Sequence, residues 1–172
     1  MPTPISELEV LIATSRWLHT NGWSIETVSL AGGRGLPPIT EQKATMTRQF
    51  EAAHIPFDER KLFRNSGPDI IASSGTHQWK VECKGISLAK ATTHRNNFDR
   101  AVASVVSYYD SRQTRLGLAL ANDYLWEYRL ERRLPVALRE AIDMWVFLVT
   151  AEGAFAYEPT DDSLPFKGAL SS

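Results

Sequence analysis

The chain has 172 residues, 43% of them hydrophobic, so it is long enough to bury one ordinary core and short for two. A formal net charge of −1 and a single cysteine, Cys83, exclude a histone-like basic protein and an internal disulfide framework. Residues 40–100 hold ten Lys and Arg against seven Asp and Glu, a mild local excess of positive charge that is compatible with phosphate contact.

The sequence predicts a cellular location and a domain organisation. No apolar run approaches the roughly 20 residues that a membrane-spanning helix needs, and no charged-then-apolar leader opens the sequence. We therefore expect a cytoplasmic protein with no membrane partner. One domain over residues 1–158 is expected, with a loosely ordered tail over 159–172 that is rich in Asp, Ser, Pro and Gly.

The first half of the chain alternates helical and strand patterns. Helical spacing of apolar residues predicts a helix that is capped at Thr3-Pro4 and ends at Gly22. A strand over 23–30, a loop over 31–38 and a helix over 40–53 with Thr40 as its cap follow. Residues 69–72 and 77–84 form a predicted β-hairpin around the turn at 73–76.

The second half continues this alternation. A loop over 85–93 leads to a helix over 97–109 and a buried strand over 115–121. Helices over 123–133 and 135–142, a strand over 145–150 and a short arm over 154–157 complete the chain. This order predicts an α/β fold with a mixed central sheet flanked by helices.

The second arm of the hairpin alternates apolar and charged residues, and the charged ones are Lys80, Glu82 and Lys84. Because side chains alternate across a strand, these three share one face. Adjacent strands lie about 4.8 Å apart, so Asp69 and Glu82 could hold one divalent cation if the register brings them level. The cation would relieve the repulsion between the carboxylates, and Lys84 would reach past it to stabilise charge on a phosphoryl group.

Pro68-Asp69 and Glu82-Cys83-Lys84, with 12 residues between the two acids, resemble the motif of the PD-(D/E)xK nucleases. The resemblance implies that family's restriction endonuclease-like αβββαβ core and a metal-dependent nuclease that hydrolyses phosphodiester bonds. It also implies that Asp69 and Glu82 bind Mg²⁺ or Mn²⁺ with help from the Cys83 backbone carbonyl. Lys84 would act on the attacking water.

Many members of this family carry a further acid on the opening helix, and Glu7 or Glu9 takes that place here. We prefer Glu7 as the catalytic and metal-binding residue because it lies closer to the buried face, whereas Glu9 can pair with Ser6 in a capping box. The chain departs from the family at Ala103-Ser104, where relatives often have Gly-Gln.

Lys80, Arg95 and Arg100 are the candidates for contact with nucleic acid. For the two arginines and for His94, solvated surface positions are the preferred interpretation, so Lys80 is the better candidate. DNA is the expected substrate, RNA is the alternative, and a homodimer is compatible with the sequence.

Three other interpretations of the motif stay open. A catalytically inactive module of the same fold could bind nucleic acid or a protein partner. Asp69 could be an ordinary turn residue while Glu82 and Lys84 belong to a solvated strand face. The third interpretation is an α/β protein that binds another ligand. A structure in which Asp69 and Glu82 do not converge would indicate it.

Overall fold

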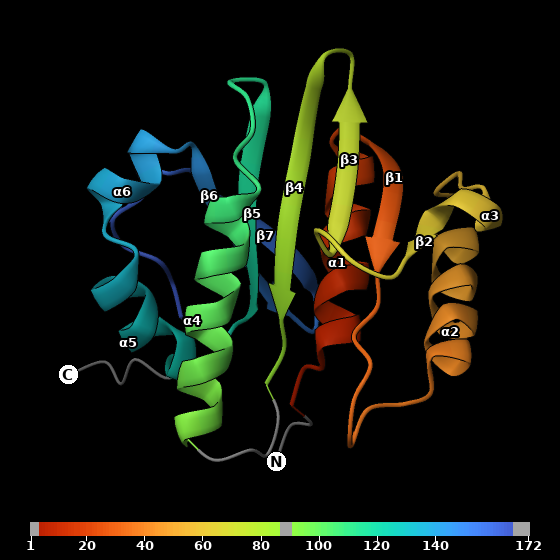
Figure 1. The fold of residues 1–172 in the computed structure, drawn as a ribbon, viewed down its shortest axis with the longest axis horizontal. Coiled ribbons are helices and arrows are strands. Elements are labelled where there is room, and N and C mark those ends of the chain that lie inside the picture. Colours follow the sequence, from red (N-terminus) through yellow and green to blue (C-terminus); the bar gives the residue numbers. More distant parts are fainter. Residues whose placement is uncertain (1–3, 87–90, 167–172) are drawn as a thin grey trace.

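The computed structural model describes residues 4–86 and 91–166. The elements in chain order are α1 (Glu7–Thr20), β1 (Ser24–Ser29), α2 (Ile39–Ala52), α3 (Glu59–Leu62), β2 (Phe63–Arg64), β3 (Ile70–Ser74), β4 (His77–Lys84), α4 (Ala91–Ser107), β5 (Thr114–Ala121), α5 (Tyr124–Arg133), α6 (Val136–Ala141), β6 (Met144–Thr150) and β7 (Gly153–Tyr157). In these ranges seven strands form one mixed sheet accompanied by six helices (Figure 1), which confirms the predicted α/β class.

The sheet has the strand order β2-β1-β3-β4-β5-β6-β7. Strands β1, β3 and β4 are antiparallel neighbours, β4, β5 and β6 are parallel neighbours, and β7 returns antiparallel along β6. Parallel neighbours need a crossover, and α4 supplies it between β4 and β5, while α5 and α6 supply it between β5 and β6. None of the helices in the described part of the chain is long and apolar enough to cross a membrane.

Helices cover both faces of the sheet. In Figure 1, α1 lies behind β1, β3 and β4, whereas α4 lies in front of β4 and β5. Each face has its own hydrophobic cluster, one against α1 and the other beneath α4 and α5. Trp79 and Cys83 are fully buried in the cluster against α1.

The first helix begins at Glu7 because Ser6 caps it. The Ser6 hydroxyl accepts a hydrogen bond from the Glu9 amide at 3.2 Å, and the Glu9 carboxylate accepts one from the Ser6 amide at 2.7 Å. This capping box satisfies two backbone donors that would otherwise lack partners. The predicted cap at Thr3-Pro4 is therefore wrong, and Thr3 itself lies outside the described residues.

Two other helix starts differ from prediction. α2 begins at Ile39 after Pro38, so Thr40 lies inside the helix and is not its cap. α4 begins at Ala91, within the predicted loop over 85–93, of which residues 87–90 lie outside the described residues. The preferred interpretation of His94 as a solvated residue is wrong, because its ring is 3% exposed and packs edge-on against Trp126.

The segment after β7, expected to be loose, contacts the domain as far as Phe166. That ring is 7% exposed and belongs to the cluster beneath α4 and α5. The Asn122 side chain donates to the Pro165 carbonyl at 3.2 Å, and the Arg139 guanidinium donates to the Asp161 carbonyl at 2.8 Å. Residues 167–172 of the expected tail lie outside the described residues.

Candidate active site

The register of the β3-β4 hairpin brings the two acids of the motif level. Ile70 pairs with Val81, and the same antiparallel register continued by one residue sets Asp69 opposite Glu82. A two-residue turn fixes this register, because Ser74 pairs directly with His77. The sequence interpretation required such a register, and the metal-binding roles of the two acids stay predictions.

Asp69 is held where β3 begins. Its Oδ2 accepts a hydrogen bond from the Cys83 amide at 2.7 Å, while its backbone carbonyl accepts one from the Ser29 amide at 2.9 Å. Burial and the neighbouring charge of Glu82 raise the pKa of Asp69 from 3.8 to about 8, against the opposing effects of Lys84 and the Cys83 amide. Without a cation, this carboxyl group therefore keeps its proton through neutral pH.

Lys84 lies between two other carboxylates. Its Nζ is 3.4 Å from both oxygens of Glu7 and 3.4 Å from Oε1 of Glu82. Burial acts to lower the pKa of Lys84, but the charges of Glu7, Asp69 and Glu82 outweigh it and raise the pKa above its ordinary value. The ammonium group therefore stays charged, although its side chain is only 16% exposed.

Glu82 is 8% exposed, and each of its two carboxylate oxygens contacts a polar side chain. Its Oε2 accepts a hydrogen bond from the Tyr108 hydroxyl at 2.9 Å, opposite the contact of Oε1 with Lys84. Burial and the charge of Glu82 raise the pKa of Tyr108, so the phenol stays protonated and remains a donor. The sequence pattern gave no sign of this contact between Tyr108 and Glu82.

Glu7 reaches the cluster because β4 ends directly against the start of α1. A Cβ atom on Gly85 would overlap backbone atoms of Ser6 and Glu7, so only glycine allows this approach. The Ile86 amide also donates to the Ile5 carbonyl at 2.8 Å, which ties the two segments together. Burial raises the pKa of Glu7, and Lys84 opposes that rise.

Of the two acids considered on the opening helix, Glu7 is the one that lies next to the motif. Glu7 contacts Lys84, whereas Glu9 is occupied by the capping box with Ser6. Its catalytic and metal-binding roles stay predictions.

The carboxylates of Asp69 and Glu82 supply some, but not all, of the oxygen ligands that a hard divalent cation needs. Two carboxylates stand level, and burial together with the charge of Glu82 raises the pKa of Asp69 even though Lys84 lies beside them. Within the described residues, however, no group of three or more His, Cys, Asp and Glu side chains is arranged to hold a metal ion. A cation at Asp69 and Glu82 would thus need main-chain carbonyl or water oxygens and would compete with Lys84.

Cys83 can contribute only its backbone to such a site. Its side chain is fully buried, and burial raises the pKa of the thiol well above its ordinary value. A protonated thiol is neither a good nucleophile nor a metal ligand. The role of its backbone carbonyl as a metal ligand, which the family resemblance implies, stays a prediction.

The predicted nucleic-acid contacts differ in their surroundings. Lys80 shares the face of Glu82 as expected, but its Nζ lies 2.6 Å from Asp110 Oδ2 and its side chain is 13% exposed. Its charge is therefore neutralised within the protein. Arg95 and Arg100 are exposed on α4, and among the described residues neither contacts the acids of the cluster.

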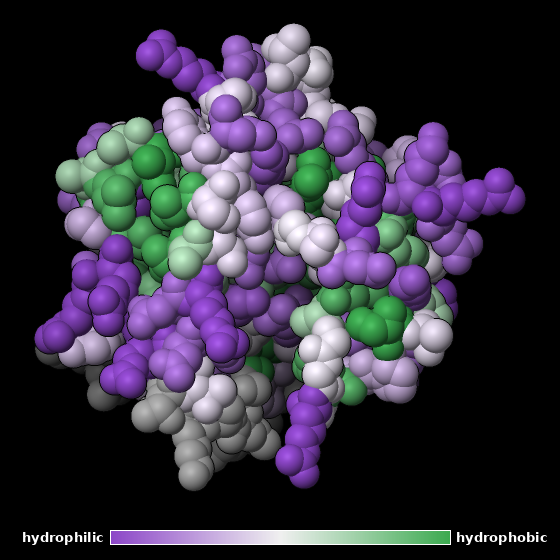
Figure 2. Space-filling model, viewed as in Figure 1, coloured by the Kyte–Doolittle hydropathy of each residue, from purple (hydrophilic) through white to green (hydrophobic). Residues whose placement is uncertain are grey.

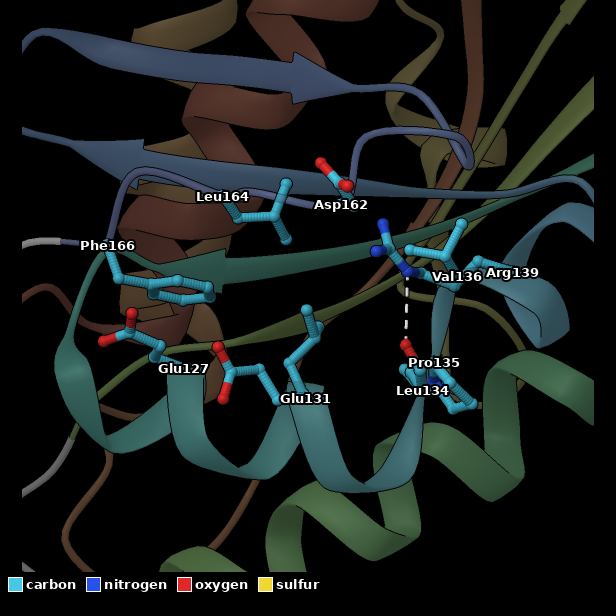
Figure 3. A pocket seen from close by; sticks show the side chains of 10 residues that line it. Glu127, Glu131, Leu134, Pro135, Val136, Arg139, Asp162, Leu164 and Phe166 are labelled. Atoms are coloured by element: carbon cyan, nitrogen blue, oxygen red, sulfur yellow. Dashed lines mark hydrogen bonds between the residues drawn. The ribbon is translucent and has the colours of Figure 1, made fainter.

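A separate cavity of about 180 Å³ lies between α5, α6 and the segment that ends at Phe166 (Figure 3). Leu130, Leu164 and Phe166 supply apolar walls, and the acids of the motif do not line it. Arg139 beside it is 2% exposed and donates to the backbone carbonyls of Leu134 and Asp161. This arginine therefore fastens the last described segment to α5.

Comparisons of the chain with models of protein families, with curated proteins and with solved structures found no match. Function is therefore inferred from the geometry and chemistry of the cluster formed by Glu7, Asp69, Glu82 and Lys84.

Proposed function

We propose that this protein is a metal-dependent nuclease of the PD-(D/E)xK type that hydrolyses phosphodiester bonds in DNA. The observation that carries the proposal is the level position of Asp69 and Glu82 on neighbouring strands, with the Lys84 ammonium beside them. The fold gives further support. The chain order α1, β1, β3, β4, α4, β5 corresponds to αβββαβ, with α2, α3 and β2 inserted after β1.

Asp69 and Glu82 would hold Mg²⁺ or Mn²⁺ together with the Cys83 carbonyl. When bound, the cation supplies positive charge to the scissile phosphate and lowers the pKa of a water molecule. Asp69 would lose its proton on binding a cation, because its pKa of about 8 results from burial and from the charge of Glu82, which Lys84 offsets only in part. Tyr108 acts as a positioning residue, since its hydroxyl orients the Glu82 carboxylate.

Lys84 provides a permanent positive charge at the reacting group. Its ammonium stabilises charge on the phosphoryl oxygens and orients the attacking water. The attacking water gives up one proton as its oxygen bonds to phosphorus, the bond from phosphorus to one sugar oxygen breaks, and the leaving oxygen takes up one proton. Glu7 positions Lys84 through the contact of 3.4 Å between their charged groups.

A specific observation favours the second candidate, an inactive nuclease-fold module that binds nucleic acid. The acids of the cluster already have partners inside the protein: Lys84 for Glu7, Tyr108 for Glu82 and the Cys83 amide for Asp69. A cluster balanced in this way could persist as a structural remnant. The two candidates differ in a single measurable property, which is cleavage that depends on a divalent cation.

The test is a cleavage panel on supercoiled, linear, branched and single-stranded DNA, with RNA alongside, in Mg²⁺, Mn²⁺ or EDTA. We expect cutting by the unmodified protein with either cation, and at least roughly 100-fold slower cutting by Asp69→Asn and Lys84→Ala. Asp99→Asn is the matched control, because this acid is exposed on α4 and pairs with Arg133. Binding without cutting on every substrate would favour the inactive module.

A further inference from the structure

A basic groove lies at the β2 edge of the sheet. Strand β2 pairs with β1 only at Val28 and Ser29, and in the described residues the first half of β1 has no strand beside it on that side. A hollow of about 680 Å³ occupies this place. Arg60, Lys61 and Arg64 contribute to its lining from α3 and β2.

Two of these three cations have no carboxylate partner. Lys61 lies 3.7 Å from Asp58, but none of the ion pairs among the described residues involves Arg60 or Arg64. The acid nearest along β1, Glu26, accepts hydrogen bonds from Ser73 and Gln78. Glu26 and Asp58 also line the groove, but among the described residues neither forms an ion pair with the exposed guanidinium groups of Arg60 and Arg64.

The sheet register aligns Arg64 with the acids of the candidate active site. Arg64 pairs with Ser29, and the Ser29 amide donates to Asp69, which is level with Glu82. At about 4.8 Å per strand, Arg64 lies roughly 10 Å from Asp69 and roughly 14 Å from Glu82 along this row.

Arg64 also belongs to the same face of the sheet as these acids. The preceding residue, Phe63, pairs with Val28, and both pack in the cluster against α1. Because successive side chains of a strand point to opposite faces, Arg64 belongs to the face away from α1. Glu82 meets Tyr108 on that same face.

The face between the acids and the groove is not covered by a helix. In Figure 1, no helix lies in front of β1 and β3, whereas α1 lies behind them and α4 stands to one side. Thr27 and Ile71, which pair on this face, are partly exposed. In the same view, Figure 2 shows hydrophilic side chains gathered over α3, at the far side of this open face.

We propose that Arg60 and Arg64 bind the phosphate backbone of the DNA whose scissile bond lies at Asp69 and Glu82. This inference rests on the proposed function and adds a substrate-binding site to it. Phosphates of one strand advance about 3.4 Å along the duplex axis per nucleotide. The anchored phosphates thus lie roughly three or four nucleotides from the scissile one, and guanidinium groups suit them because they donate paired hydrogen bonds.

Binding of a fluorescein-labelled 20-base-pair DNA duplex, measured by fluorescence anisotropy with Ca²⁺ in place of Mg²⁺, tests the groove. We expect the double variant Arg60→Ala/Arg64→Ala to bind roughly tenfold more weakly and the salt slope of log K to fall by about 1.8, or about 0.9 per lost contact. The matched control is Arg112→Ala/Arg132→Ala, which removes two exposed arginines elsewhere and should change affinity less than twofold.

Cleavage by the same variants separates the two proposals. We expect the groove variant to cut normally at saturating DNA, with a raised KM. The groove proposal is overturned, with the nuclease retained, if this variant binds within twofold of the unmodified protein or if the control weakens equally. If the unmodified protein neither binds nor cuts DNA, both proposals fail.

Discussion

Replacing Asp69 with Asn is expected to stabilise the metal-free protein above neutral pH, although it removes a central acid of the candidate site. Asparagine has nearly the same size and keeps an oxygen that can accept the hydrogen bond from the Cys83 amide, which is 2.7 Å long. It cannot become negatively charged beside Glu82. The substitution thus removes a destabilising charge while it preserves the local hydrogen bond.

The sign and size of this effect follow from the pKa of Asp69. Its folded value of about 8 exceeds the ordinary 3.8, so between these values the folded protein holds a proton that the unfolded chain has lost. The stabilisation that the proton on Asp69 gives to the folded protein is complete below pH 3.8 and is lost as the pH rises through 8. At about 1.4 kcal/mol per pH unit the upper limit is roughly 6 kcal/mol. Because Glu82 shares the effect and the site can relax, we expect about 1–3 kcal/mol.

Urea unfolding in EDTA at pH 5, 7 and 9 measures this difference. We expect the free energy of unfolding of Asp69→Asn to exceed that of the unmodified protein at pH 9, with the gap shrinking toward pH 5. Asp110→Asn is the control and should lower the free energy of unfolding, because a hydrogen bond from Lys80 lowers the pKa of that exposed carboxyl. A gap that does not change with pH, or an Asp69→Asn protein that is less stable at pH 9, refutes the reasoning.

Three further substitutions test other parts of the site by urea unfolding at pH 8. Lys84→Met leaves buried carboxylates without their cation and should cost about 2–4 kcal/mol, whereas an unchanged stability would contradict the described ion pairs. Tyr108→Phe removes the hydrogen bond to Glu82 and should cost about 1 kcal/mol. Gly85→Ala should cost about 1–3 kcal/mol through overlap with the start of α1, whereas Gly32→Ala should cost much less, because its added Cβ would make only an ordinary contact of 3.8 Å with the Ile39 side chain.

Local pattern was enough to predict the shared face of the charged residues in β4. Alternation along one strand depends only on backbone geometry, so Lys80, Glu82 and Lys84 had to share a side. The choice of Glu7 could also be made locally, because Ser6 offers Glu9 a capping role three residues away.

Local sequence pattern could not predict contacts between segments that are distant in the chain. Tyr108 meets Glu82 across 26 residues, and Asp110 neutralises Lys80 across 30, so neither pair leaves a periodic signal. The short elements α3 and β2 were missed for a related reason. A two-residue strand is stabilised by its pairing with β1, since its own sequence is too short to show alternation.

Calorimetric titration of Mn²⁺ into the protein at pH 8 tests the central claim most directly, because it asks whether Asp69 and Glu82 share a cation. We predict measurable heat and a rise in melting temperature for the unmodified protein and for Asp99→Asn, and the loss of both for Asp69→Asn and Glu82→Gln. Absence of heat with the unmodified protein, or equal binding by Asp69→Asn, would contradict the account.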